Sequence, residues 1–141
     1  MRTRRGVLGM ALFVLALIIF SGCKGNPLPE GMEEEELIAA GQEMVALLNE
    51  RDYEAVADRF REDVREHVTA ESVSGLVDQL LNEVGDYKKE DKTLATGQTN
   101  EETGEFYGIA VILCTHAKDD VMYRLAFDSN MTLIGLSVSK Q

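Results

Sequence analysis

The C-terminal part of the chain alternates apolar and polar residues, and this alternation restricts the fold more than any other feature. Four strands are predicted near 87–98, 105–117, 120–128 and 131–139, with polar loops between them. Lys118-Asp119 and Ser129-Asn130 are interpreted as two-residue turns, which fixes the strand registers. The predicted partners are Cys114 with Tyr123, Ile112 with Leu125, Tyr123 with Leu136, Leu125 with Ile134 and Val121 with Val138.

These two turns agree on one apolar face, which indicates an antiparallel sheet with a single buried side. The predicted core face comprises Ala110, Ile112, Cys114, His116, Val121, Tyr123, Leu125, Phe127, Ile134, Leu136 and Val138. The opposite face carries Ile109, Val111, Leu113, Met122, Ala126 and Leu133, which is too apolar for a fully solvated surface. We expect Ile109, Val111, Leu113 and Met122 to form a homodimer or a contact with another envelope protein, unless the chain itself covers them.

Three helices are predicted before the strands. The first spans about 33–49, the second is short and begins after Asp52 as its N-cap, and the third runs from Thr69 as N-cap to Gly85. Their apolar stripes are Leu37, Gly41, Met44, Val45 and Leu48; Tyr53, Val56 and Phe60; and Val73, Leu76, Val77, Leu80, Leu81 and Val84. The sequence therefore predicts an α+β domain, with three helices packed on a curved four-stranded antiparallel sheet.

Two segments carry a family resemblance. Residues 48–56, Leu-Asn-Glu-Arg-Asp-Tyr-Glu-Ala-Val, resemble the helix-turn-helix entry of the nuclear transport factor 2-like, cystatin-like cone. Residues 125–136 resemble its closing hairpin. The resemblance covers about 33–140 and is similar in particular to a prokaryotic domain of unknown function found in small lipoproteins. It implies the cone fold; some members of the superfamily are isomerases or dehydratases with acids or histidines inside the cone, and many others only bind ligands or partners.

The N-terminus has the composition of an export signal. Three arginines lie within residues 2–5, and an unbroken apolar run of 14 residues follows at 7–20. A permanent membrane-spanning helix needs about 20 apolar residues, so an uncleaved anchor is the weaker interpretation. Phe20-Ser21-Gly22-Cys23 resembles the lipobox of prokaryotic lipoproteins, although the family favours an aliphatic residue at the position of Phe20. This resemblance implies cleavage before Cys23 and attachment of lipid to its thiol.

The predicted organisation follows from this signal. Residues 1–22 form a lipoprotein signal peptide, 23–31 a lipidated tether with both prolines of the chain, and 32–141 the α+β domain. The expected location is the extracytoplasmic face of the cell membrane. An ordinary cleavable signal is the alternative, and residues 3–8 also resemble a twin-arginine export signal.

The charge of the mature chain restricts its partners. Removing residues 1–22 takes away three of the 14 basic side chains and none of the 25 acidic ones, which leaves a formal charge of −14. Nucleic acid is excluded as an expected partner, because a polyanion would be repelled. Membrane contact is expected through the lipid on Cys23. With Cys23 lipidated, Cys114 has no disulfide partner; a Cys23–Cys114 bridge is the alternative.

Few residues suggest chemistry. Cys114 and His116 share a strand face and suit a nucleophile and base or two metal ligands, but the remaining members of such a site are missing, and packing explains both. We therefore predict no catalytic, cofactor-binding or metal residues. Tyr53, Tyr123 and His116 are the candidates for a pocket that takes a small apolar ligand.

Two functions are consistent with these patterns. The first is a membrane-anchored, non-catalytic module that binds a small ligand or a protein at the membrane surface. The second is a small lyase or isomerase, which would use His116 with Tyr123 or Cys114 and requires His116 to face a cavity.

Overall fold

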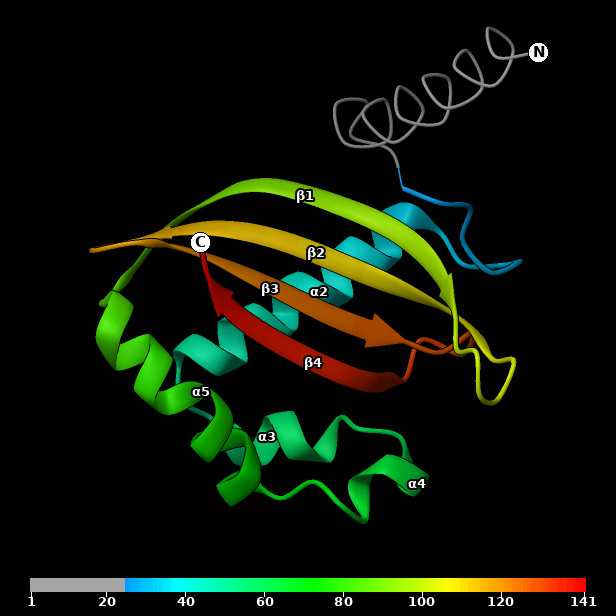
Figure 1. Cartoon of the computed structure of the whole chain (residues 1–141), viewed down its shortest axis with the longest axis horizontal. Helices are drawn as coiled ribbons and strands as arrows, with labels where there is room; N and C mark the ends of the chain where they lie inside the picture. Colours follow the sequence, from blue (N-terminus) through cyan, green and yellow to red (C-terminus); the bar gives the residue numbers. More distant parts are fainter. Residues whose placement is uncertain (1–24) are drawn as a thin grey trace, which may run out of the picture.

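The structure, a computed structural model, describes residues 25–141 as a sheet with helices against one of its faces. The elements are α2 (Glu34–Asn49), α3 (Tyr53–Asp58), α4 (Glu62–Arg65), α5 (Ala70–Val84), β1 (Tyr87–Thr99), β2 (Phe106–His116), β3 (Asp120–Phe127) and β4 (Leu133–Lys140). In Figure 1, α2 crosses behind the curved sheet, and α3, α4 and α5 lie beyond β4. The predicted α+β class is confirmed. The predicted signal peptide and Cys23 lie outside the described residues.

The helix ends follow the predicted capping residues. The Asp52 carboxylate accepts from the backbone N–H of Ala55, and Thr69 and Ser72 form a reciprocal capping box at the start of α5. Gly85 ends α5 with φ +83°, a conformation that favours glycine. The prediction missed α4, which is four residues long and has no fully buried residue, so it leaves no apolar stripe in the sequence.

The four strands form one antiparallel sheet in the order β1-β2-β3-β4. The predicted β2–β3 register was wrong by two residues, since Cys114 pairs with Val121 and Ile112 with Tyr123. The backbone N–H of His116 donates to the carbonyl of Asp119, so the turn is Ala117-Lys118, one residue earlier than predicted. A two-residue shift preserves which side chains share a face, and the predicted core face therefore survives in this hairpin.

The β3–β4 connection differs more. The backbone N–H of Asp128 donates to the carbonyl of Thr132, which leaves a loop of three residues between them. Met131, the last residue of this loop, adopts φ +64°. The predicted β3–β4 register was also wrong by two residues, since Tyr123 pairs with Val138, Leu125 with Leu136 and Val121 with Lys140, and a bulge beside Phe127 shifts it further at the start of β4. As a result Leu133, predicted on the outer face, is 1% exposed in the core, and Ile134, predicted in the core, lies outside the core cluster.

The core lies between α2, α3, α5 and the inner face of the sheet. Its largest fully buried side chains are Tyr123, Leu37, Met44, Leu48, Ile112, Leu125 and Leu133. One predicted stripe residue was placed wrongly: Leu76 is 60% exposed, because α5 turns only the row of Val73, Val77, Leu81 and Val84 fully inward.

The first described residues lie against β1. The backbone N–H of Gly97 donates to the carbonyl of Asn26, and the N–H of Asn26 donates to Thr96 Oγ1. Leu28 packs against the core, and Met32 is buried. Residues 25–27, within the segment predicted as a tether, therefore lie beside the β1 edge of the sheet.

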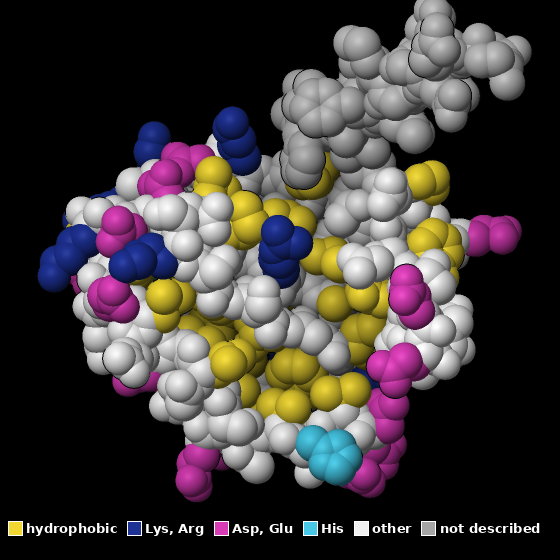
Figure 2. Space-filling view, viewed as in Figure 1, with side chains coloured by type: hydrophobic (Ala, Val, Ile, Leu, Met, Phe, Trp, Pro, Cys, Tyr) yellow, Lys and Arg dark blue, Asp and Glu magenta, His cyan; other side chains and the backbone are white. Residues whose placement is uncertain are grey.

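The outer face of the sheet holds the residues predicted to make a protein contact. Ile109, Val111, Leu113 and Met122 are all half-buried, and Arg124 beside them is exposed. Figure 2 shows hydrophobic side chains across this view of the molecule, with lysine and arginine side chains between them. A homodimer or heteromeric contact through this face stays a prediction.

Candidate functional site

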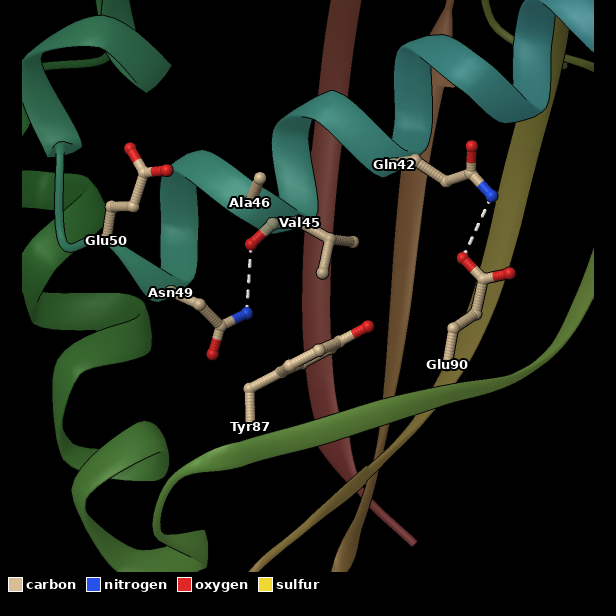
Figure 3. A pocket seen from close by; sticks show the side chains of 7 residues that line it. All are labelled: Gln42, Val45, Ala46, Asn49, Glu50, Tyr87 and Glu90. Atoms are coloured by element: carbon tan, nitrogen blue, oxygen red, sulfur yellow. Dashed lines mark hydrogen bonds between the residues drawn. The ribbon is translucent and has the colours of Figure 1, made fainter.

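A pocket of about 370 Å³ lies between α2 and the first residues of β1. Its size falls within the range of small-molecule sites, roughly 300–1,000 Å³. Figure 3 shows the Tyr87 ring extending from β1 beneath α2, with Asn49 on one side and Glu90 on the other. The lining residues are Gln42, Val45, Ala46, Asn49, Glu50, Tyr87 and Glu90.

Irregularity in β1 brings two of these residues to the same side. Tyr87 and Glu90 are three apart, so a regular strand would point them to opposite faces. The register shifts after Tyr87 and again after Glu90, and the two residues pair with His116 and Cys114, which both face the core. The first shift, between Tyr87 and Lys89, thus places both side chains on the face that packs against α2.

A buried hydrogen-bond chain supports the pocket from behind. His116 Nδ1 lies 2.9 Å from the carbonyl oxygen of Gly85, an acceptor only, so Nδ1 carries the proton. Nε2 of the ring then accepts from the Tyr123 hydroxyl at 2.8 Å. That hydroxyl in turn accepts from Asn49 Nδ2 at 3.0 Å, and burial raises the pKa of Tyr123, which keeps it a donor.

Asn49 carries this chain to the pocket wall. Its second amide hydrogen is donated to the carbonyl of Val45 at 2.9 Å, so both hydrogens are in use. Within residues 25–141 no hydrogen bond reaches Asn49 Oδ1, and no buried side-chain nitrogen or oxygen lacks a partner. Asn49 therefore offers the pocket an accessible acceptor with a fixed orientation.

The rim of the pocket is acidic. Glu50 ends α2 on one side, and Glu90 lies on the other, where Gln42 Nε2 donates to its Oε1 at 2.9 Å. In the described part of the chain neither carboxylate forms an ion pair. The adjacent Arg51 is engaged elsewhere, with Asp78 and Asn82.

Cys114 and His116 lie side by side behind the pocket and are not available for the chemistry considered from sequence. Cys114 is fully buried, and burial, with a smaller effect from the charge of Glu90, raises the pKa of its thiol to about 11. The thiol is therefore protonated near neutral pH and unreactive. Across residues 25–141, no group of three or more His, Cys, Asp or Glu residues is arranged to hold a metal ion.

Of the three residues predicted to line a pocket, His116 and Tyr123 are brought together by a hydrogen bond, and Tyr53 lies apart from them. Tyr123 is 0% exposed and His116 3%, and both lie behind the pocket wall. Tyr53 lies on a separate, more open depression, where its hydroxyl donates to Asp78 at 2.9 Å. A lyase or isomerase that uses His116 requires the ring at a cavity, whereas here both ring nitrogens bond to Gly85 and Tyr123.

Comparison with known proteins places this arrangement in a family. The model of a protein family of unknown function, DUF3887, matches residues 41–136. The chain belongs to the DUF3887 family. The match contains every residue that lines the pocket, together with the buried chain behind it.

A solved structure supports the same fold. The chain is similar to the protein in an NMR structure from Ruminococcus gnavus ATCC 29149, with 28% identity and a TM-score of 0.68; the match covers 79% of this chain and 96% of that one. A comparison with curated proteins found no match. None of the helices described here is long and apolar enough to cross a membrane.

Proposed function

We propose that this DUF3887 protein is a lipid-anchored, extracytoplasmic binding module whose ligand site is the pocket between α2 and β1. The main support for the proposal is the hydrogen-bond chain from Gly85 through His116 and Tyr123 to Asn49. This chain fixes the position of the pocket wall and leaves Asn49 Oδ1 without a hydrogen bond among the described residues. A wall whose donors are already satisfied is organised before a ligand arrives, and such sites bind with little ordering cost. The curved sheet with helices on one face supports placement in the cystatin-like, nuclear transport factor 2-like superfamily.

The proposed anchor is the lipid on Cys23, supported by the lipobox resemblance and the apolar run before it. Gly25 lies against Thr96 of β1, two residues after Cys23. Two residues span at most about 7 Å, so the anchor would hold the β1 edge close to the bilayer. The module would then work at the membrane surface.

Replacing the lipidated residue tests the anchor. Cys23→Ala is expected to abolish labelling by an alkyne fatty acid and to move the protein out of the fraction that needs detergent for extraction, because the thiol is the proposed attachment site. Fractionation and in-gel fluorescence measure both effects, with Cys114→Ala as the thiol control. Unchanged labelling of Cys23→Ala would contradict the anchor, and unlabelled but membrane-bound protein would favour an uncleaved segment at 7–20.

The pocket is tested by blocking its mouth. Gln42 is an exposed residue on α2 that reaches across to Glu90, so Gln42→Trp is expected to cover the opening. Native mass spectrometry of full-length protein extracted gently from its membrane should show a small-molecule adduct that Gln42→Trp loses. Gln79→Trp, a matched change at an exposed glutamine of α5, should keep it. An adduct equally abundant in all three proteins, or none in the wild type, would contradict the proposal.

A further inference from the structure

We propose that the pocket between α2 and β1 takes a small organic cation, such as a primary amine with an apolar body. This inference rests on the proposed function, since it assigns a chemical class to the ligand of the same site. It follows from three properties of the lining: unpaired carboxylates, an aromatic face and an acceptor without a competing donor.

The carboxylates set the sign of the ligand. Glu50 and Glu90 lie at opposite ends of the opening, and the lining contains no Lys, Arg or His. Gln42 occupies one oxygen of Glu90, and Oε2 has no hydrogen-bond partner within residues 25–141. Two unneutralised carboxylates beside an apolar wall attract a cation and repel an anion.

The aromatic residue provides the second contact. Tyr87 is 40% exposed, although its ring also packs edge-on against His116, with ring centroids 5.7 Å apart. The contact with His116 fixes the ring orientation and leaves part of the ring in the pocket. An ammonium group above an aromatic face is stabilised by the ring electrons, and Val45 and Ala46 supply apolar surface for the rest of the ligand.

Asn49 provides the third contact. Both of its amide hydrogens are donated inside the domain, so the side chain presents only Oδ1 to a ligand. An ammonium group has three donors and no acceptor, so it can donate to Oδ1 at one end of the pocket or to Oε2 of Glu90 at the other. A carboxylate or phosphate ligand would find no donor at Asn49 and two negative charges nearby.

Phenethylammonium, phenethyl alcohol and phenylacetate have similar sizes and differ in charge, so they separate the effect of charge on affinity from that of shape. Each is titrated into the lipidated ¹⁵N-labelled protein in a neutral detergent, and binding is followed by NMR. Phenethylammonium is expected to bind at least about tenfold more tightly than phenylacetate, with the largest shifts at Asn49, Tyr87 and Glu90. The double variant Glu50→Gln/Glu90→Gln should reduce the affinity for phenethylammonium to about that for the alcohol. Glu54→Gln/Glu71→Gln removes the same charge from the other depression and should leave the affinity unchanged.

The outcomes distinguish the two proposals. If the alcohol or phenylacetate binds in the pocket as tightly as phenethylammonium, or if both double variants weaken phenethylammonium equally, the cation assignment is overturned while a binding pocket remains. If no probe binds but the Gln42-dependent adduct is present, the cation assignment is again overturned. Absence of both probe binding and adduct overturns the proposed function as well.

Discussion

Gly41→Val is expected to lower the free energy of unfolding by about 2–4 kcal/mol, because α2 packs directly against the sheet at this glycine and leaves no room for a side chain. A Cβ at Gly41 would lie 2.7 Å from the Cβ of Ala110 and 3.0 Å from Cδ1 of Ile112. The Ala110 Cβ is fixed to the backbone of a central strand, so relief requires a shift of the whole helix. Urea denaturation monitored by far-ultraviolet circular dichroism measures the change.

A second glycine provides the control for this prediction. Gly75 lies on an exposed position of α5, and a Cβ there meets nothing within 4 Å. Gly75→Ala should therefore raise the free energy of unfolding by up to about 1 kcal/mol, through helix propensity alone. Equal effects of the two substitutions would mean that α2 does not pack on β2 as described.

Tyr123→Phe is also expected to lower the free energy of unfolding substantially, by about 2–3 kcal/mol. The substitution keeps the ring but removes the hydroxyl that donates to His116 Nε2 and accepts from Asn49. His116 Nε2 would then lack its donor and Asn49 Nδ2 would lack its acceptor, beside a tyrosine position that is fully buried. Each unpaired buried group costs about 1–3 kcal/mol. Chemical denaturation of the two proteins measures the difference.

Tyr53→Phe is the matched control, since Tyr53 also donates a hydrogen bond but is only half-buried. Its effect should stay below about 1 kcal/mol, because water replaces the lost contact with Asp78. The ¹⁵N shifts of His116 give an independent readout: the wild type should show a protonated Nδ1 and an unprotonated Nε2. The reverse tautomer, or equal effects of the two substitutions, would contradict the proposed chain.

Much of the fold could be predicted from local pattern. The caps at Asp52 and Thr69 and the end of α5 at Gly85 depend on a few neighbouring residues, and these predictions were confirmed. The hairpin registers depend on loop geometry, and there the prediction failed. A turn one residue early shifted β3 against β2, and the positive φ of Met131 lengthened the loop before β4.

The pocket could not be predicted in the same way. Tyr87 and Glu90 reach α2 only because β1 is irregular, and alternation assumes a regular strand. The sequence pattern predicts Asn49 only as the last residue of a helix. Its role in the pocket wall depends on a hydrogen bond to Tyr123, which is 74 residues away in the sequence. The Tyr123 hydroxyl bonds to His116 on the preceding strand as well as to Asn49, and no local pattern indicates either contact.

The most direct test of the ligand site is a crystal structure of the full-length protein purified from its own membranes with bound small molecules retained. We expect electron density for a ligand between α2 and β1, in contact with Tyr87 and within hydrogen-bond distance of Asn49 Oδ1. Density at another site, with Tyr87 folded against Val45 so that the pocket between α2 and β1 is closed, would contradict it.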